Sequence, residues 1–450
     1  THHALRITNH LSRVTRHRKV VYFMSCTAVI GAQWGDEGKG KIIHLLAEKA
    51  DVVVRFGSAD IPGHTVFYNG VKYKLHFIPV GIFYQEKLSV LGNGMVIDLA
   101  MLTEEMDYLK KNGVSLENLK ISSMAHIVMP YHKLLDRLEA EENDTAKKGR
   151  TRKGVASAYL DKVARKGIRV MDLMDEVLFK DKLRKLIEEK NKFFNEFYNL
   201  SSKGFDVIYN DYINYRNIIA PYVTNTPFLL NSLSSQGKKI LFEGIQGTFM
   251  DLDFGTYPYV GNYNFTAGSA CIGSGIGPTR IKHIIGVTKA YITRVGEGPF
   301  PTELLDDMGE ELRAAGGEYG STTGRPRRCG WLDLPMIRYS TIINGLTGLG
   351  VTKLDVLDGF ETIKLCVGYE YEGQIYKDFP QDIKILEKCK PVYREFPGWQ
   401  QDTIKVKHYD DLPQEAQNYL NYISEQAGVE VFLVSVGHQR EQTIVKREVW

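Results

Sequence analysis

Short apolar runs separated by amphipathic stretches alternate along the chain. The run Thr27-Ala28-Val29-Ile30 predicts a short buried strand, and the apolar residues of 41–49 recur at the spacing of a helix. Further apolar runs predict strands at 52–54, 89–91, 240–242, 283–287 and 431–434. Strands that alternate with helices are typical of an α/β fold, so we expect a large, mainly parallel central sheet with helical subdomains.

One longer stretch, residues 175–198, has helical periodicity throughout. Lysines and glutamates cover most of it, and its apolar side carries Leu183, Ile187, Phe194 and Phe197. This pattern predicts an amphipathic helix packed on the core rather than a helix reserved for a partner. No internal repeat, low-complexity tract or Pro/Ser-rich linker interrupts the chain, so we expect residues 25–450 to form a single domain.

The N-terminal segment differs from the rest in its charge. The first nineteen residues contain arginines, a lysine and histidines but no acid, and they lack the apolar stretch of a signal peptide. We therefore expect residues 1–24 to be a disordered basic tail, with a transit peptide as the alternative.

Composition narrows the class of protein and its partners. Hydrophobic residues make up 43% and charged residues 25% of the 450, as in an ordinary globular protein. The formal net charge of +3 argues against nucleic acid as a main partner, and no apolar run approaches the roughly 20 residues of a membrane helix. Five scattered cysteines without Cys-x-x-Cys spacing indicate reduced thiols, so we expect a cytoplasmic protein.

The segment Gly31-Ala32-Gln33-Trp34-Gly35-Asp36-Glu37-Gly38-Lys39-Gly40-Lys41 carries the strongest indication of chemistry. It lies between a predicted strand and a predicted helix, the order of a P-loop-like phosphate-binding unit. It does not match the Walker A pattern, because Gly40 stands where a Ser or Thr would bind magnesium. Its glycines let backbone N–H groups approach phosphate oxygens, and Lys39 can neutralise their charge. Asp36 would be repelled by a triphosphate unless a metal bridges them or the carboxylate has a chemical task.

Two further motifs indicate ligands. Lys353-Leu354-Asp355 is similar to the guanine-reading Lys-x-Asp of GTPases, because a carboxylate can accept two hydrogen bonds from guanine. A cluster of arginines beside two threonines suits a dicarboxylate; it consists of Thr322, Thr323, Arg325, Arg327 and Arg328. Taken alone, each motif also has a plainer interpretation as a solvated surface segment.

From about residue 27 to the C-terminus, the chain resembles the adenylosuccinate synthetase family. The resemblance rests on the glycine-rich segment and on further strings at 63–65, 161–165, 243–248, 255–259, 296–304, 322–333, 352–355 and 435–437. It implies an enzyme, a GTP-dependent ligase of purine biosynthesis. Such a ligase joins L-aspartate to the 6-oxo position of IMP through a 6-phosphoryl intermediate and releases adenylosuccinate.

The resemblance also implies catalytic roles. Asp36 would be the base that removes the N1 proton of IMP, and His64 would stabilise charge on the transferring phosphoryl group. Gln246 would hydrogen-bond the 6-oxo region. One Mg²⁺ per active site would be held by the phosphates, the Asp36 carboxylate and the Gly63 carbonyl.

Binding roles follow from the same resemblance. GTP, the co-substrate, would contact Gly35, Glu37, Gly38, Lys39, Gly40, Lys41, Lys353, Asp355, Ser435 and Gly437. L-Aspartate would contact Thr322, Thr323, Arg325 and Arg327, and the acceptor would contact Thr151, Arg165, Gln246 and Arg325. Arg165 corresponds to a residue that crosses a subunit interface, which implies a homodimer.

Four positions depart from the family pattern where it binds the acceptor's phosphate: Ile61, Arg150, Lys153 and Gly261. Each lost hydrogen bond to a charged group costs roughly 1.5–3 kcal/mol, so IMP would bind weakly unless the added cations compensate. Besides IMP ligation, two hypotheses stay open. The acceptor is a modified or deoxy purine nucleotide, or one without the 5′-phosphate; or the protein is a non-catalytic GTP-binding homologue. Retention of Asp36, His64, Gln246 and Arg325 argues against the second.

Overall fold

The computed structural model describes residues 26–58, 64–68, 70–142, 152–201, 204–320 and 324–450. The basic N-terminal segment lies outside these ranges, so its expected disorder stays a prediction. The side chains of 58, 64, 65, 67 and 142 are also outside the described part.

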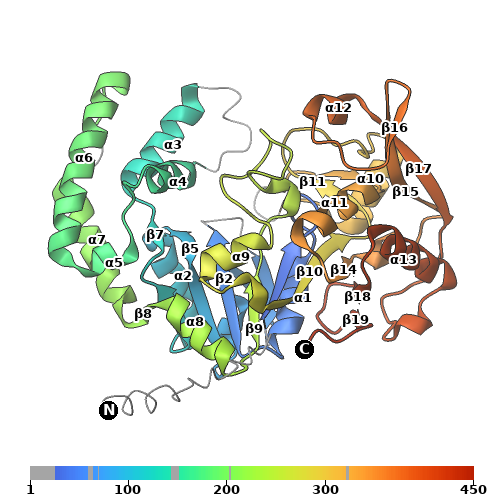
Figure 1. Cartoon of the computed structure of the whole chain (residues 1–450), viewed down its shortest axis with the longest axis horizontal. Coiled ribbons are helices and arrows are strands. Elements are labelled where there is room, and N and C mark those ends of the chain that lie inside the picture. The colour runs from blue at the N-terminus through green and yellow to red at the C-terminus, as the bar shows by residue number, and fades with distance from the viewer. Residues whose placement is uncertain (1–25, 59–63, 69, 143–151, 202–203, 321–323) are drawn as a thin grey trace, which may run out of the picture.

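A large sheet fills the middle of the molecule (Figure 1). Its described strands are ordered β19-β18-β14-β10-β1-β9-β2-β5-β6-β8, with β7 beside β5, and among them only β18 and β19 pair antiparallel. The strands are β1 (Cys26–Gly31), β2 (Val52–Ser58), β5 (Leu88–Ile97), β6 (Leu119–Ser122), β7 (His126–Ile127), β8 (Val223–Thr224), β9 (Ile240–Glu243), β10 (Ile281–Lys289), β14 (Gly348–Thr352), β18 (Val431–Ser435) and β19 (Thr443–Val445). The predicted, mainly parallel sheet is confirmed, and each predicted strand lies within one of these.

Helices cover both faces of this sheet, and that explains why β1 has all six residues buried. They are α1 (Lys39–Ala47), α2 (Leu99–Lys111), α3 (Pro130–Glu142), α4 (Val155–Val163), α5 (Val170–Met174), α6 (Glu176–Tyr198), α7 (Phe205–Ile219), α8 (Thr226–Ser235), α9 (Gly268–Ser274), α10 (Asp307–Gly316), α11 (Leu334–Asn344), α12 (Ile383–Lys388) and α13 (Gln414–Ala427). In Figure 1, α3 to α7 form a helical side on the left.

Helix α6 confirms the long predicted helix almost to the residue. Asp175 begins it, with its carboxylate accepting from the backbone N–H of Leu178 at 3.0 Å. Leu183, Ile187 and Phe194 are buried, as predicted from their spacing. Phe197 is 65% exposed, so its predicted burial was wrong: it lies in the last turn, against the ring of Phe193, which is itself partly exposed.

Smaller sheets flank the central one. On the right of Figure 1, a second sheet combines β13 (Leu332–Asp333), β15 (Thr362–Tyr371), β16 (Gln374–Tyr376) and β17 (Lys390–Pro397). Two antiparallel pairs complete the described strands, β3 (His64–Tyr68) with β4 (Val71–Leu75) and β11 (Ile292–Arg294) with β12 (Arg328–Gly330). Besides the expected helical subdomains, the molecule therefore contains small β-sheets. They carry some of the predicted site residues, such as His64 at the start of β3.

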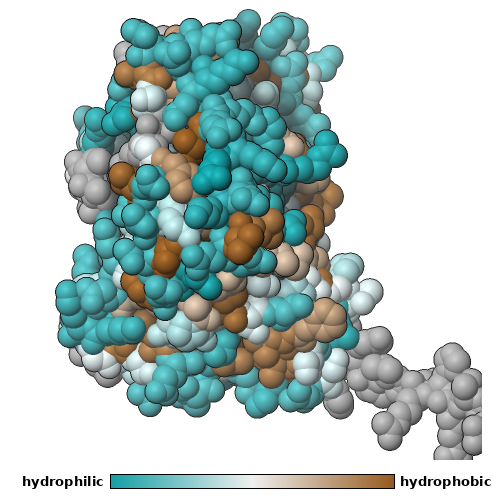
Figure 2. Space-filling model, turned by 90° about the vertical axis from the view of Figure 1, so that its left-hand side faces the viewer, coloured by the Kyte–Doolittle hydropathy of each residue, from teal (hydrophilic) through white to brown (hydrophobic). Residues whose placement is uncertain are grey.

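The outer surface of the helical side is mainly hydrophilic. Figure 2 shows separate apolar groups among hydrophilic ones on this face. Among the residues that the structure describes, we find no helix that combines the length and the apolar character needed to cross a bilayer.

Asp333 is a buried carboxyl group at the start of α11. It accepts hydrogen bonds from the backbone N–H of Met336 at 3.2 Å and from the Tyr369 hydroxyl at 2.6 Å. The side chain is 1% exposed, and this burial raises the pKa of Asp333 to about 7. Between the ordinary pKa of an aspartate and pH 7, Asp333 is therefore protonated in the folded chain but ionised in the unfolded chain.

Replacing Asp333 by asparagine is expected to flatten the dependence of stability on pH. Because the folded-state pKa lies above that of the unfolded chain, the parent should lose about 2.5 kcal/mol of unfolding free energy between pH 5 and 7.5. The asparagine variant keeps both acceptor contacts but has no proton to lose. Urea unfolding of both proteins at pH 5 and pH 7.5 measures the difference, and equal losses in the two would contradict this assignment.

Candidate active site

The predicted binding segments converge at one edge of the central sheet. Strands β18, β14, β10, β1 and β9 are neighbours in that order, and each neighbouring pair is parallel. The carboxyl ends of parallel strands meet at one edge, where α/β proteins bind their ligands. Asp36 follows β1, Gln246 follows β9, Lys353 follows β14, and Ser435 ends β18. Segments far apart in the sequence thus form one site.

Glu37 organises the glycine-rich loop from inside. Its carboxylate is fully buried and accepts from the backbone N–H groups of Gln33 at 3.1 Å and Gly35 at 2.9 Å. Its second oxygen pairs with the Lys39 ammonium, and the Thr352 hydroxyl donates to its backbone carbonyl. Glu37 therefore braces the loop, and Lys39, which we expected at the phosphates, is paired inside the protein here.

Close packing explains the glycine that opens this loop. A Cβ atom on Gly31 would lie 2.4 Å from the backbone oxygen of Gln246 and 2.5 Å from the Glu37 carboxylate. At the other end, Gly38 has φ 81° and forms the N-cap of α1. Helix α1 consequently begins at Lys39, two residues before the predicted periodic stretch, and ends at Ala47.

Asp36 lies on the outer side of the same loop. Its φ of 60° is left-handed, and its side chain is 45% exposed. One carboxylate oxygen lies 3.2 Å from Nε of Arg327. The Gln246 side chain also reaches the loop, since its Oε1 would lie 2.9 Å from a Cβ atom on Gly35. The structure therefore brings the predicted base, Gln246 and a predicted aspartate-binding arginine to one loop.

Several predicted residues lie outside the described part of the chain. They are Gly63, Thr151, Thr322 and Thr323, together with Ile61 and Arg150 of the departures. The backbone of His64 is described and begins β3, paired with Leu75, but its side chain is not. The roles predicted for these residues stay predictions.

Asp355, whose carboxylate is predicted to bind guanine, has an oxygen atom available to a ligand. Asp355 lies in the short helix Leu354–Leu357 directly after Lys353, whose φ is 57°. Its Oδ1 is buried and has no hydrogen-bond partner among the described residues. Burial raises the pKa of Asp355, with nearby cations including Lys41 opposing this effect. A buried carboxylate oxygen without a donor is costly unless a ligand supplies one.

Lys41 ties the start of α1 to the C-terminal segment. Its ammonium donates to the Ser435 hydroxyl and to the carbonyls of Gly437 and Gln442, each at 2.8 Å. Burial lowers the pKa of Lys41 to about 8. Three of the predicted GTP-binding residues therefore form one cluster, in which Lys41 holds the turn after β18 in place.

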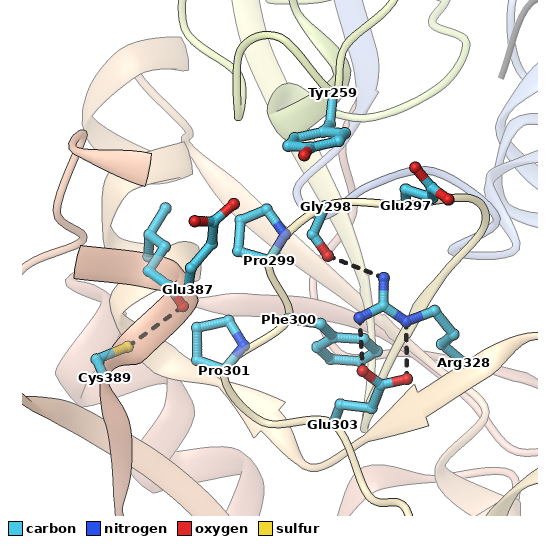
Figure 3. Close-up of a pocket in the computed structure, with 11 residues that line it drawn as sticks. Tyr259, Glu297, Gly298, Pro299, Phe300, Pro301, Glu303, Arg328, Glu387 and Cys389 are labelled. Atoms are coloured by element: carbon cyan, nitrogen blue, oxygen red, sulfur yellow. Dashed lines mark hydrogen bonds and ion pairs between the residues drawn. The ribbon is translucent and has the colours of Figure 1, made fainter. Parts of the chain in front are cut away.

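The expected trap of three arginines is divided. Arg328 binds Glu303 through two nitrogens and donates to the Gly298 carbonyl at 2.9 Å, at the wall of a cavity of about 470 Å³ (Figure 3). Arg327 contacts Asp36 instead, because successive side chains at a strand point to opposite faces. The inclusion of Arg328 in the trap was therefore wrong. The cavity is lined by 297–301, Tyr259, Glu303, Arg328, 386–387 and Cys389, away from the predicted GTP residues.

Arg325 occupies the exposed part of the same segment. Its backbone carbonyl accepts from Gly320 at 2.8 Å, and Tyr319 pairs antiparallel with Pro326. Residues 319–320 and 324–326 thus lie side by side. Next to this pairing, the backbone N–H of Arg327 donates to the Glu318 carbonyl at 2.9 Å.

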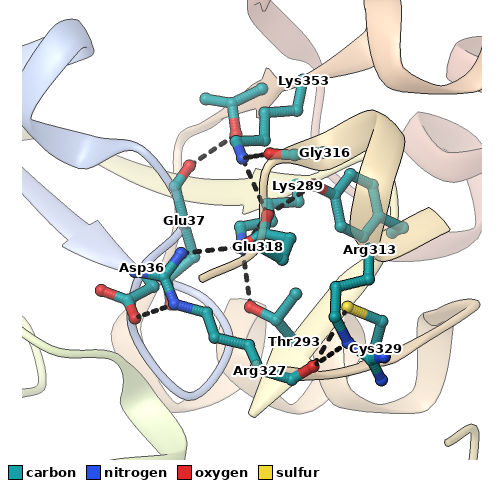
Figure 4. A network of polar contacts seen from close by, with 12 residues as sticks. Asp36, Glu37, Lys289, Thr293, Arg313, Gly316, Glu318, Arg327, Cys329 and Lys353 are labelled. Carbon is teal, nitrogen blue, oxygen red and sulfur yellow. Dashed lines mark hydrogen bonds and ion pairs between the residues drawn. The ribbon is translucent and has the colours of Figure 1, made fainter. Parts of the chain in front are cut away.

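Glu318 is a site residue that the sequence analysis missed. The fully buried carboxylate accepts from Lys289 at 2.7 Å, Lys353 at 2.8 Å and Arg327 at 2.6 Å (Figure 4). Burial alone would raise the pKa of Glu318, but the charges of Lys289 and Lys353 outweigh it and hold the pKa below its usual range. A signal was present in the sequence, since Glu318 stands between glycines directly before the predicted trap, and Lys289 ends an apolar strand.

The predicted acceptor side is partly described. Arg165 is exposed, just after α4, with φ 64°. Helix α4 is anchored by Asp136, which accepts from the backbone N–H of Gly154 at 2.8 Å. At Gly261, a Cβ atom would lie 2.6 Å from the Phe265 ring, so a larger side chain would not fit without displacing that ring. This departure is therefore built into the local packing.

The described residues fit a magnesium ion held mainly by phosphates. Among them, no group of three or more His, Cys, Asp or Glu side chains gathers into a metal cage. The half-exposed Asp36 carboxylate at the glycine-rich loop offers the kind of hard oxygen ligand that Mg²⁺ prefers. One or two carboxylates plus substrate phosphates are the usual Mg²⁺ environment in nucleotide-dependent enzymes.

Comparison with known proteins places these features in a family. The family model described as adenylosuccinate synthetase matches residues 28–444. The adenylosuccinate synthetase of Carboxydothermus hydrogenoformans is 53% identical over 427 residues, which cover 95% of this chain and 100% of the relative. That of Thermoanaerobacter pseudethanolicus is 51% identical over 425 residues, covering 94% and 100%.

Solved structures are similar as well. The fully ligated adenylosuccinate synthetase of Plasmodium falciparum has a TM-score of 0.87 and 38% identity, covering 94% of this chain and 100% of that one. A cyanophage S-2L succinoaminodeoxyadenylate synthetase bound to dGMP and dATP has a TM-score of 0.59 and 18% identity, covering 94% and 96%. The second likeness shows a shared fold only.

Proposed function

The chain belongs to the adenylosuccinate synthetase family, and from this premise we propose how its residues perform the reaction. It is a GTP-hydrolysing ligase that joins L-aspartate to the 6-oxo position of IMP and uses Mg²⁺. Identity of about half over most of the chain does not favour a changed acceptor or a non-catalytic homologue. The residue assignments rest on one observation: Asp36 and Arg327 meet at the loop that follows β1.

The chemistry begins with a proton transfer. Asp36 takes the N1 proton of IMP, and the O6 atom then attacks the γ-phosphoryl group and expels GDP. Gln246 hydrogen-bonds the 6-oxo region, and His64 stabilises charge on the transferring group. Asp36 and Gly63 would hold Mg²⁺, which would supply positive charge to the phosphate oxygens when bound. The amine of L-aspartate finally attacks C6, inorganic phosphate leaves, and adenylosuccinate forms.

Each substrate has its own contacts in this proposal. Asp355 reads guanine through its buried oxygen, with Lys353, Ser435 and Gly437 around the base. The phosphates lie on the loop and the N-terminus of α1, against Gly35, Glu37, Gly38, Lys39, Gly40 and Lys41. Arg327 binds the substrate dicarboxylate with Thr322, Thr323 and Arg325. The acceptor contacts Thr151, Arg165, Gln246 and Arg325, and Lys153 supplies charge near its phosphate.

Measuring GDP release in the presence of aspartate tests which molecule is the acceptor. We expect turnover with micromolar IMP, less with dIMP, GMP or dGMP, and none with inosine or without an acceptor. The reason is that the added cations expected near the acceptor phosphate, such as Lys153, can pair only with a phosphorylated nucleotide. Faster turnover with another acceptor would contradict the assignment of IMP, and tight GTP binding without turnover would support a non-catalytic protein.

We further propose that the active unit is a homodimer in which Arg165 reaches the partner's acceptor site. Arg165 is exposed, and the neighbouring apolar residues Leu160 and Val163 of α4 are 62% and 79% exposed, as expected for a surface that a second copy covers. Mixing an Asp36→Asn chain with an Arg165→Ala chain should restore about a quarter of parent activity, because half of the dimers are mixed and each has one intact site. Unchanged low activity after subunit exchange would refute a contribution across the interface.

Residues 25–450 are proposed to act as a single domain. The contact of Lys41 with Ser435 supports this, because it joins the beginning of the described chain to its end. All five cysteines are free thiols, which suits the cytoplasm that we propose as the compartment.

A further inference from the structure

Glu318 joins two substrate sites through opposite oxygens of one carboxylate. Oε1 accepts from Lys353, which precedes the guanine-reading Asp355, and from Lys289 and the Tyr291 hydroxyl. Oε2 accepts from Arg327, which in turn pairs with Asp36. A single buried side chain therefore lies between the GTP base site, the aspartate-binding arginine and the predicted catalytic base.

The backbone around Glu318 repeats the same connection. The Lys353 ammonium donates to the Gly316 carbonyl at 2.6 Å, and the backbone N–H of Arg327 donates to the Glu318 carbonyl at 2.9 Å. The segment 316–318 is thus held on one side by Lys353 of the guanine-reading segment and on the other by the backbone of Arg327. A shift of Lys353 would be passed to Arg327 through these contacts.

A plainer explanation is that Glu318 only neutralises Lys289. Lys289 is fully buried, and its ammonium contacts Glu318 and the Thr293 hydroxyl at 2.6 Å. A buried cation needs such a partner. This explanation accounts for Oε1 but not for Oε2, which is used by Arg327. Glu318 also contacts more than one cation, since Lys289, Lys353 and Arg327 all form ion pairs with its carboxylate.

We propose that Glu318 is a positioning residue that holds Lys353 and Arg327 in fixed relation, so that GTP and L-aspartate both meet Asp36. The inference rests on the proposed function, because it takes the substrates of Lys353 and Arg327 from it. Glu318 has no contact with substrate in this role. It acts only through the two cations that it orients.

The test removes the Glu318 charge without leaving Lys289 unpaired. The variant Glu318→Gln is made in a Lys289→Met background, and Lys289→Met alone is the reference. Relative to that reference, KM for GTP and KM for L-aspartate should each rise about tenfold, as expected when a charged hydrogen-bond partner is lost, whereas KM for IMP should change less than about twofold. Calorimetric titration with GTP alone should show a matching loss of affinity.

The matched control is Glu105→Gln. Glu105 is also a buried carboxylate, 6% exposed, but the hydrogen bonds that it accepts come from the backbone N–H groups of His76, Phe77 and Ile78, none of which is predicted to bind GTP or L-aspartate. Its three KM values should equal those of the parent. A rise for GTP and aspartate only in the Glu318 variant supports the inference, because a merely structural defect would lower the active fraction and leave KM unchanged.

Two negative results are distinguishable. If the parent turns over IMP but the double variant keeps the KM values of Lys289→Met, Glu318 serves only as the counter-ion of Lys289 and the inference is overturned. If the parent itself fails to turn over IMP, the proposed function fails, and unchanged calorimetric GTP affinity in the double variant would then overturn the inference separately.

Discussion

Replacing Asp36 by asparagine should lower kcat about a thousandfold while GTP affinity stays within about threefold, as expected for loss of a general base. Asparagine has the same shape and tolerates the left-handed backbone that Asp36 adopts at φ 60°. It can still face Arg327, but it cannot take up the N1 proton of IMP. The loss should therefore fall on the chemical step rather than on folding or nucleotide binding.

Turnover and GTP titration of the same preparation measure this split. Asp107→Asn is a suitable control, since Asp107 forms an exposed ion pair with Lys111 on α2, and its removal should leave both quantities unchanged. A near-normal turnover rate in Asp36→Asn would contradict the role of Asp36 as the general base. A parallel loss of GTP affinity and rate would instead make Asp36 chiefly a group that holds the nucleotide and its metal ion.

Asp355→Ala should raise KM for GTP about a hundredfold and lower kcat by less than about fivefold, because two hydrogen bonds from guanine to a buried carboxylate are lost together. The unpaired Oδ1 of Asp355 is the acceptor that this prediction depends on. Alanine also removes the group that rejects adenine, which has no pair of donors to offer. The ratio of GTP to ATP use should fall with the rise in KM.

The chain offers a closely matched control in Asp358. This carboxylate lies three residues further on, but it already accepts from Trp399 Nε1 and from the backbone N–H of Thr403, both at 2.7 Å. Asp358→Ala should reduce thermal stability and leave the preference for GTP intact. Equal use of ATP and GTP by the parent enzyme would contradict the guanine-reading role of Asp355.

Local patterns predicted much of the fold. The apolar run at 27–30 and the helical spacing after it become β1 and α1, and the 175–198 stretch becomes α6. These predictions succeeded because a strand–loop–helix unit depends on residues that are close in sequence. Burial of Phe197 was the exception, since what covers the last turn of a helix depends on elements elsewhere in the chain.

Partners of charged side chains were harder to predict. Three arginines close together at 325–328 looked like one anion trap, but Arg328 faces Glu303 and only Arg327 faces Asp36. The sequence does not show which of these neighbouring side chains faces Asp36, because that depends on how β12 lies in the folded chain. Glu318 was missed for a related reason. A glutamate among glycines is typical of a surface loop, and only the fold places three cations around it.

The sequence by itself determined the family and its reaction. It also predicted the loop at 31–41, Asp36 and Asp355 as parts of the site, because these are carried by short contiguous strings. Only the tertiary structure decided that Glu37 braces that loop, that Lys41 is bound to the turn after β18, and that Glu318 lies between Lys353 and Arg327. These are contacts between the carboxyl ends of strands that are adjacent in space but distant along the chain. Sheet order and burial, which fix those neighbours and their charges, are properties of the folded chain as a whole.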